Sequence, residues 1–329
     1  MDIPHHLPVD NYYLGLTPYT PLAPVSLDDG GPVIWCKLEF FNPSGSTKDR
    51  IATYILTKAW RSGELTEGSV VVEASSGSTS IAMAMVSAQL GLRFIAVMPE
   101  GVSNERSLMI KAYGGEVVLS PREEGVIGSV SLSREIAERE DGFLPRQFEN
   151  MDNAQAHRLY TAREIVSQVP GECVDAVVSG VGTGGTLVGL HLGLRDHGCQ
   201  ARPFAARPVS QSGEPAACAG CFHDAEHCSY SSQIPGVLDN MSKIYNPDDL
   251  PGLVEVEVDD RLAIETTRAL IRKGFPVGPS SGLNYAAAVE ASRQLGPGAK
   301  IVTVFCDRME RYFSTELFTG MPATRVGAC

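Results

Sequence analysis

The stretch NPSGSTKDR, residues 42–50, places a lysine where turn-forming residues give way to a helical pattern. Apolar residues recur after it with the period of a helix, at Ile51, Tyr54 and Ile55. Lys48 is therefore expected at or near a helix N-terminus, where the positive end of the peptide dipoles disfavours the protonated amine. Burial would lower its pKa further and leave a neutral amine that can attack a carbonyl or remove a proton. The alternative is a solvated lysine in a capped first turn.

On either side of this stretch, short apolar runs rich in β-branched residues alternate with helix-period segments. The expected strands are 33–38, 69–72, 93–98, 116–119, 175–178, 202–206, 254–258 and 301–305. The expected helices are 48–62, 78–90, 104–113, 127–138, 153–168, 185–196, 260–273 and 282–295. This alternation predicts an α/β protein with mostly parallel sheets covered on both faces, which binds ligands at the carboxyl ends of its strands. Residues 208–253 are rich in Gly, Ser, Pro and Cys, and we expect a functional or mobile segment there.

Two polar loops each join an expected strand to an expected helix. The first, EASSGSTS at residues 73–80, carries five hydroxyls and a glycine and would suit a carboxylate, although an N-cap with surplus serines is the alternative. The second, GVGTGGT at residues 180–186, lets the backbone approach a phosphate closely. It matches the dinucleotide fingerprint formally, but no ribose-binding acid follows at the expected distance, so a compact monophosphate is the better ligand.

A third loop, GPSSG at residues 278–282, also precedes an expected helix, but its specificity alone is low. A reactive lysine, a carboxylate cradle and a monophosphate cradle together describe a site for pyridoxal phosphate. The aldehyde of this cofactor needs an amine, its phosphate needs a glycine loop, and its amino-acid partner brings a carboxylate.

The composition is that of an ordinary globular protein. The chain has 329 residues, of which 43% are hydrophobic and 20% charged, and one large or two medium domains are expected. Its net charge of −12 disfavours a nucleic-acid partner. No apolar stretch approaches membrane-spanning length and no signal peptide is evident at the N-terminus, so we expect a cytoplasmic protein that does not bind membranes.

The eight cysteines are mostly scattered, and we expect reduced thiols. A separate cluster contains Cys218, Cys221, His223, His227 and Cys228. Its residue types suit zinc, but the spacing fits no standard finger. Three interpretations stay open, in this order of preference: reduced unliganded thiols, a structural zinc site and a redox disulfide.

The chain resembles the cysteine synthase / cystathionine β-synthase family of fold type II pyridoxal-phosphate enzymes. Besides the loops above, the resemblance rests on short motifs spread over nearly the whole chain: TPL at 20–22, KLE at 37–39, MPE at 98–100, SNER at 103–106, QF at 147–148, and Asp307 with ERYFST at 310–315. It implies two three-layer α/β/α domains with mostly parallel sheets and an active site in the cleft between them. Residues 1–46 and 151–329 would form the large cofactor-binding domain, and residues 47–150 a smaller mobile domain that binds the substrate carboxylate.

The resemblance also implies a role for each loop residue. Lys48 would carry the cofactor as an internal aldimine and then act as the base on the substrate Cα, and Ser280 would face the pyridine nitrogen. The remaining cofactor contacts would come from Ser78, Gly182, Thr183, Gly184, Gly185 and Thr186. The substrate contacts would come from Ser75, Ser76, Gly77, Thr79, Gln147 and Gly236.

The implied chemistry is β-replacement on an activated serine, such as O-acetyl- or O-phosphoserine, through an aminoacrylate to cysteine or a related amino acid. The alternative is a β-eliminating lyase, like a cysteine desulfhydrase, that releases pyruvate and ammonia. A non-catalytic binding protein on the same fold is the third possibility. We expect a homodimer that acts on a small amino acid, and a serine acetyltransferase-type partner is a further expectation from the family.

Two departures from the family pattern bear on the substrate. The usual loop reads Thr-Ser-Gly-Asn-Thr-Gly, and Ser78 stands where the asparagine normally donates to the phenolic oxygen of the cofactor. Because serine is shorter, we expect it to reach that oxygen through water. Leu238 replaces the second glycine of a Gly-Ile-Gly element beside the substrate, which would reshape the pocket. The Ser-Ser-Gly-Ser-Thr variant is similar to that of members with cysteine desulfhydrase activity.

Overall fold

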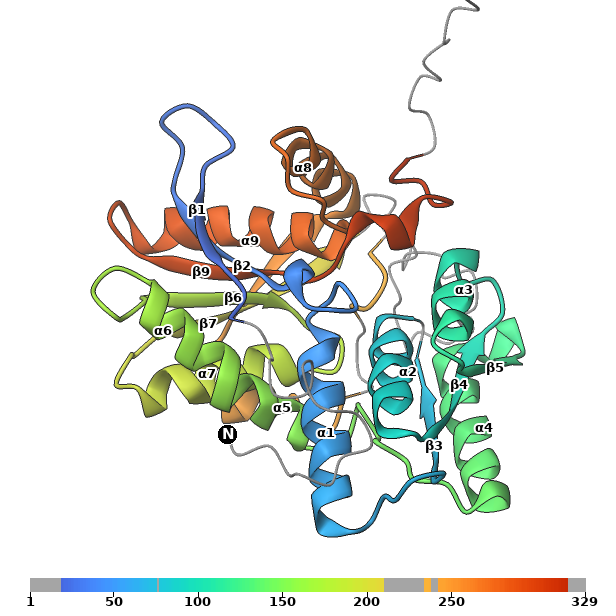
Figure 1. Cartoon of the computed structure of the whole chain (residues 1–329). Helices are drawn as coiled ribbons and strands as arrows, with labels where there is room; N and C mark the ends of the chain where they lie inside the picture. Colours follow the sequence, from blue (N-terminus) through green and yellow to red (C-terminus); the bar gives the residue numbers. More distant parts are fainter. Residues whose placement is uncertain (1–18, 76, 210–233, 238–241, 319–329) are drawn as a thin grey trace, which may run out of the picture.

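The computed structural model describes residues 19–75, 77–209, 234–237 and 242–318, and within them the strands form two sheets (Figure 1). The larger sheet has the order β1 (Leu22–Val25), β2 (Ile34–Leu38), β9 (Ile301–Phe305), β6 (Ala176–Gly180), β7 (Arg202–Val209) and β8 (Val254–Asp259). The smaller has the order β3 (Val70–Ala74), β4 (Arg93–Pro99) and β5 (Glu116–Ser120). Every pairing is parallel except that of β1 with β2, so the predicted mostly parallel α/β fold is confirmed.

Helices cover both faces of the larger sheet. One face packs against α8 (Asp260–Arg272) and α9 (Pro279–Leu295), and the other against α5 (Asp152–Ala156), α6 (Ala162–Gln168) and α7 (Gly185–Asp196). Alternate residues of one strand enter the two cores: Ile34 and Cys36 of β2 pack with the α8–α9 side, and Trp35 packs with the α7 side. This alternation is what a strand covered on both faces requires.

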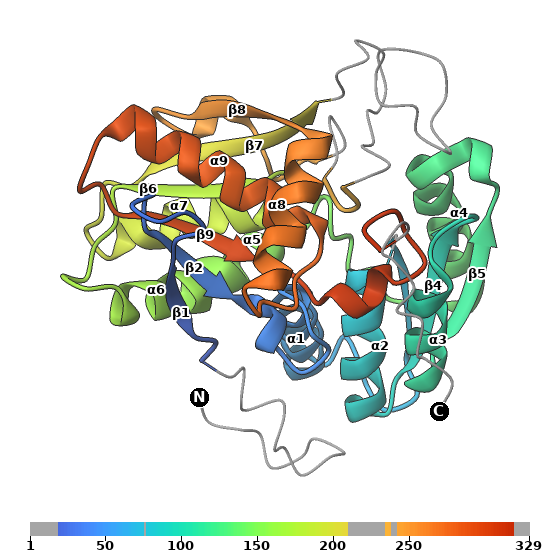
Figure 2. The ribbon, with the colours of Figure 1, turned by 90° about the horizontal axis from the view of Figure 1, so that it is seen from above.

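The smaller sheet is also covered on both faces. The core on one face joins it to α1 (Lys48–Ser62), α2 (Ser78–Leu90) and α3 (Asn104–Ala112), and α4 (Gly125–Glu140) covers the other face (Figure 2). The first helix, α1, contacts both α2 and α5, so it lies where the two sheet units meet. In the described parts of the chain, no helix combines the length and apolarity needed to cross a bilayer.

Most predicted elements are found near their predicted bounds, with two exceptions. The strand β1 was not predicted, because Pro24 lies within it; an edge strand tolerates proline since one side of its backbone needs no partner. The helix expected over 153–168 is interrupted by a π-helical stretch at His157–Thr161, between α5 and α6. Such bulges frequently occur at functional sites.

A buried ion cluster holds the first turn of α1 against the larger unit. Arg50 Nε lies 2.6 Å from Glu39 Oε2, and Arg50 Nη1 lies 2.7 Å from Glu164 Oε1. Lys37 Nζ lies 2.7 Å from Glu164 Oε2, and Thr20 Oγ1 donates to Glu39 Oε1 at 2.7 Å. All five side chains are almost completely withdrawn from solvent. Because Arg50 lies two residues after Lys48, this cluster fixes the helix that begins at Lys48.

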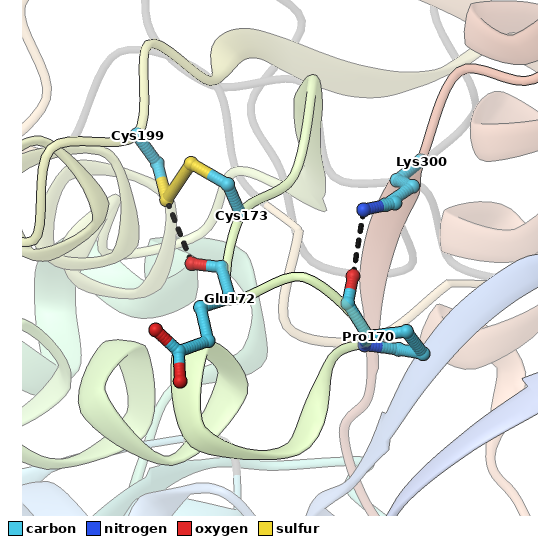
Figure 3. The surroundings of a disulfide bond; sticks show 5 residues. All are labelled: Pro170, Glu172, Cys173, Cys199 and Lys300. Carbon is cyan, nitrogen blue, oxygen red and sulfur yellow. Dashed lines mark hydrogen bonds between the residues drawn. A yellow bond between two sulfur atoms is a disulfide. The ribbon is translucent and has the colours of Figure 1, made fainter.

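The expectation of reduced thiols is wrong for one pair of cysteines. Cys173, which follows α6, and Cys199, which follows α7, form a disulfide with their Cα atoms 5.4 Å apart (Figure 3). Twenty-six residues separate them in sequence, and the fold brings the ends of the two helices together. Of the other described cysteines, Cys36 and Cys306 are free.

Candidate active site

A single cavity collects most of the predicted site residues. Its lining includes Lys48, Ser75, Ser78, Thr79, Gln147, Gly182, Thr183, Gly184, Thr186, Gly236 and Ser280. Gln147 and Gly236 lie in loops, and the others come from the ends of β3 and β6 and the starts of α1, α2, α7 and α9. The cavity therefore lies at the carboxyl ends of parallel strands, as the fold class predicts.

Some predicted residues do not line the cavity. Gly77 packs against the Arg106 side chain, and Gly185 packs against Asn153; at each position a Cβ atom would overlap these neighbours. Ser76, Leu238 and the cluster that includes Cys218 and Cys228 lie outside the described residues. Among the described residues, no group of three or more metal-ligating side chains could hold a metal ion.

Lys48 is the first residue of α1, as predicted, and its backbone N–H donates to Ser46 Oγ at 3.3 Å. Burial lowers the pKa of its amine below the ordinary value, while the nearby Cys306 and Asp307 act in the opposite direction. Because its pKa is lowered, a larger fraction of the Lys48 amine is unprotonated at neutral pH than for a surface lysine. The side chain thus suits attack on a carbonyl.

The first loop is closed by its own hydrogen bonds. Ser75 Oγ accepts from the backbone N–H groups of Gly77 at 3.0 Å and Ser80 at 3.3 Å, so its own O–H remains available as a donor. Thr79 Oγ1 donates to Gln147 Oε1 at 2.6 Å, and Gln147 Nε2 donates to the carbonyl of Ala74 at 2.6 Å. The second N–H of this amide is a further donor. The loop therefore presents pre-oriented donors to an anion.

A buried carboxyl group, that of Glu73, supports the end of this loop. Glu73 Oε1 accepts from the backbone N–H of Ala74 at 2.9 Å, and Oε2 accepts from that of Gln147 at 3.2 Å. Burial raises the pKa of Glu73 to about 8. Arg146, which immediately precedes Gln147, has a φ of 55°, and this backbone conformation is strained for a residue with a side chain. The clamp holds Gln147 at the cavity despite this strain.

Ser78 joins the two sheet units. Its hydroxyl donates to Asp307 Oδ2 at 3.2 Å, across 229 residues of sequence, and Tyr312 O–H donates to the same oxygen at 2.7 Å. The guanidinium carbon of Arg106 lies 5.2 Å from the centre of the Tyr312 ring. Arg106, Asp307 and Tyr312 also line the cavity. The sequence motifs contained these three residues, but nothing in the sequence showed that Ser78 would bond to one of them.

The second loop approaches other backbone too closely for side chains. A Cβ at position 182 would overlap the carbonyl oxygen of Gly236, and Gly184 has a φ of +77° with no room beside Tyr245. Helix α7, 12 residues long, begins directly after Gly184, so its first-turn N–H groups and positive dipole end lie at the cavity. Among the described lining residues Asp307 is the only carboxylic acid, and it lies after β9 rather than in this loop. An anionic phosphate fits here.

The threonines of this loop have buried partners. Thr183 Oγ1 accepts from Asn153 Nδ2 at 2.9 Å, and Thr186 Oγ1 lies 3.3 Å from His157 Nε2. His157 Nδ1 in turn lies 3.0 Å from Thr161 Oγ1. Burial lowers the pKa of His157 to about 3, so the imidazole is neutral at physiological pH. The π-helical stretch that contains His157 and Thr161 thus supports the start of α7.

The arrangement corresponds to a known family. A family model described as pyridoxal-phosphate dependent enzyme matches residues 11–307. The chain belongs to this family. A cysteine synthase of Staphylococcus aureus is 37% identical to it over 319 residues, which cover 95% of this chain and 98% of that protein.

Solved structures agree with this family. A hydrogen sulfide-producing enzyme of Fusobacterium nucleatum is 34% identical, with a TM-score of 0.80, 92% of this chain covered and 90% of that one. An O-acetylserine-dependent cystathionine β-synthase of Helicobacter pylori is 30% identical, also with a TM-score of 0.80, and 97% of this chain and 100% of that one are covered. This pyridoxal-phosphate-dependent enzyme is thus a fold type II member.

One asparagine ties two ends of the enzyme's site together. Asn284 Oδ1 accepts from the backbone N–H of Gly180 at 2.7 Å, and its Nδ2 donates to the carbonyl of Val304 at 2.8 Å. Asn284 lies on α9, which carries Ser280 in its first turn, so its side chain ties the end of β6 to this helix. Burial raises the pKa of the neighbouring Cys306 thiol to about 11, which keeps it uncharged.

Proposed function

We propose that this enzyme replaces the β-substituent of an activated serine, such as O-acetyl- or O-phosphoserine, and yields cysteine or a related β-substituted amino acid. The observation that carries the proposal is the shared cavity: a lysine of lowered pKa, a loop of hydroxyl and amide donors, and a helix N-terminus behind a glycine loop. The similarity to the S. aureus cysteine synthase and to the H. pylori enzyme, which depends on O-acetylserine, supports the same class of substrate.

The residues would divide the work by position. Lys48 would be the attachment point, the loop from Gly182 to Thr186 would hold the phosphate, and Ser280 would face the ring nitrogen, which a hydroxyl would leave largely uncharged. The bound cofactor supplies an aldehyde for the substrate amine and a ring that spreads negative charge from Cα. The carboxylate of the substrate would meet the O–H of Ser75 and the free N–H of Gln147, with Ser76, Gly77, Thr79 and Gly236 around it.

Lys48 would also handle the proton of the substrate Cα. The neutral side chain of Lys48 would take this proton. Burial lowers the pKa of Lys48, and the charge of Asp307 acts in the opposite direction, so Asp307 would favour the ammonium that results. The hydrogen bond from Ser78 to Asp307 holds the carboxylate between the two sheet units while this happens. The chain thus supplies both the base and the counter-charge.

Elimination to pyruvate and ammonia is the second candidate. The similarity to the hydrogen sulfide-producing enzyme of F. nucleatum and the serine at position 78 favour it. Binding without catalysis has no observation in its favour, because the chain belongs to a family of enzymes and Lys48 lines the cavity.

We further propose that residues 47–150 form a smaller domain that closes over the substrate, and that residues 1–46 and 151–329 form the larger one. The separate three-stranded sheet supports this division. The Ser78–Asp307 bond would then form only when the domains are together. A homodimer and a serine acetyltransferase-type partner stay predictions from the family resemblance, and a cytoplasmic location stays a prediction from the sequence.

Substrate trials on the purified enzyme would test these candidates. O-acetylserine or O-phosphoserine is supplied with sulfide, and cysteine is measured; in parallel, cysteine alone is supplied and pyruvate is measured. Replacement predicts cysteine formation far faster than pyruvate release, and the reverse ratio would establish elimination. Lys48→Ala should abolish both activities and the visible absorbance of the bound cofactor. An unchanged absorbance in that variant would exclude Lys48 as the attachment point.

A further inference from the structure

Asn153 is a buried side chain that joins the two ends of the active site. It lies in the first turn of α5, is 1% exposed, and does not line the cavity. Its Nδ2 group donates to the carbonyl of Gln147 at 2.8 Å and to Thr183 Oγ1 at 2.9 Å. One amide group therefore uses both of its N–H donors, each toward a different wall of the cavity.

Each of its partners belongs to a further set of contacts. Gln147 bonds through its side chain to Thr79 and to Ala74, at the end of β3 and the start of α2. Thr183 also accepts from the backbone N–H of Gly185 at 3.4 Å, and Ser242 Oγ donates to its carbonyl at 2.6 Å. The hydrogen bonds of Asn153 to Thr183 and to the Gln147 carbonyl, with those of the Gln147 side chain, thus connect the phosphate loop of the larger sheet to the carboxylate loop of the smaller sheet.

The surroundings leave Asn153 one orientation. Gly185, the first residue of α7, packs directly against its Oδ1 atom, and a Cβ at this position would overlap it. A side chain that is closely packed and has both N–H groups bonded cannot turn without breaking a buried hydrogen bond. A shift of Thr183 is therefore transmitted to the carbonyl of Gln147.

We propose that Asn153 is a positioning residue that couples occupancy of the phosphate loop to the orientation of Gln147, so that cofactor and substrate each strengthen the binding of the other. The inference rests on the proposed function, in which the phosphate loop binds the cofactor and Gln147 binds the substrate carboxylate. The coupling is reciprocal, as any equilibrium linkage between two ligands must be. Asn153 itself touches neither ligand.

Thr183→Val tests the coupling, because it removes the hydroxyl that Asn153 reaches and keeps the shape of the side chain. Two quantities are measured on the holoenzyme: the retention of pyridoxal phosphate on dialysis, and the affinity for L-alanine, which has no β-leaving group, from the cofactor absorbance. We expect Thr183→Val to weaken both, with alanine affinity falling roughly three- to tenfold, the effect of one hydrogen bond. In an Asn153→Ala background, the same substitution should leave alanine affinity unchanged.

Thr186→Val is the matched control. Thr186 lies in the same loop and lines the same cavity, but its hydroxyl contacts His157 instead of Asn153. The Thr186→Val variant should retain less cofactor on dialysis and should bind L-alanine with unchanged affinity. If Thr183→Val also leaves alanine affinity unchanged, or lowers it equally with and without Asn153, the coupling is refuted. If Asn153→Ala does not fold, the comparison of the two threonine variants decides. A wild-type enzyme that retains cofactor but shows no alanine binding would instead refute the proposed function.

Discussion

Replacing Arg50 with methionine tests whether the buried ion cluster beneath α1 stabilises the fold and the lysine end of the site. The guanidinium makes five hydrogen bonds: two to Glu39 at 2.6 and 2.7 Å, two to Glu164 at 2.7 and 2.8 Å, and one to Thr20 at 3.2 Å. With Lys37, the cluster contains two positive and two negative side chains. Arg50→Met would leave two carboxylates facing one ammonium, an unbalanced charge in a site closed to water.

Removing one partner of a buried ion pair costs about 3–5 kcal/mol, because the desolvated charge that remains has lost its counter-ion. The total stability of a folded domain is only about 5–15 kcal/mol. We therefore expect Arg50→Met to lower the free energy of unfolding by about 3–5 kcal/mol. Arg50→Lys should lose less, since it keeps the charge but not the planar fork that bonds two carboxylates.

Equilibrium urea unfolding, followed by circular dichroism, measures this loss. The matched control is Arg93→Met, because Arg93 also pairs with two carboxylates, Glu116 at 2.6 Å and Glu140 at 2.7 Å. The difference is exposure: the Arg93 and Glu116 side chains are 44% and 50% exposed, and solvent screens their attraction. Arg93→Met should therefore cost only a small fraction of the loss in Arg50→Met.

The pH dependence gives a second measurement of the same cluster. Burial acts to raise the pKa of Glu39, but the Arg50 charge and its hydrogen bonds outweigh burial and hold it at about 2. The stability from this carboxylate is thus fully present above its ordinary pKa of 4.5 and is lost as the pH falls through about 2. In Arg50→Met, acid unfolding should begin at higher pH. Equal losses in Arg50→Met and Arg93→Met, with the same acid-unfolding curve as the wild type, would refute the reasoning.

Three further predictions concern other parts of the structure. Gly182→Ala should abolish cofactor retention on dialysis, because its methyl group would overlap the carbonyl oxygen of Gly236; full retention would contradict the close approach. His157 has its pKa lowered to about 3 by burial, so the unfolded chain binds more protons and stability declines as the pH falls from 6.5 toward 3. His157→Gln should flatten this part of the stability profile. Cys199→Ser should cost about 3 kcal/mol, from the loop of 26 residues that its bond with Cys173 closes. Alkylation of both cysteines in the unreduced, unfolded chain would exclude the bond.

Local signals explain why part of the site could be read from the sequence. Helices begin at Lys48, Ser78 and Gly185 as predicted, because a polar or glycine-rich turn followed by a periodic apolar pattern specifies a helix start within a few residues. The alternation of strands and helices then places these starts at the carboxyl ends of parallel strands. Local chemistry thus identified the loops that line the cavity.

Other features depend on partners that are distant in the sequence. The π-helical break at His157 is accompanied by a contact with Thr186, 29 residues later. Reduced thiols were expected because the cysteines are scattered and no export signal is evident, and sequence spacing does not reveal that Cys173 and Cys199 meet in space. Asn153 carries no sequence signal of its role, since its two acceptors come from separate loops.

The sequence by itself determined the α/β class and the positions of Lys48 and of the two polar loops that line the cavity, because each follows from residues that are neighbours along the chain. Only the tertiary structure decided that Ser78 would bond to Asp307, that Asn153 would join the loops, and that Arg50 would be neutralised by two buried carboxylates. These contacts depend on the packing of two sheet units against each other. Packing brings together groups more than a hundred residues apart, at distances that no local pattern encodes.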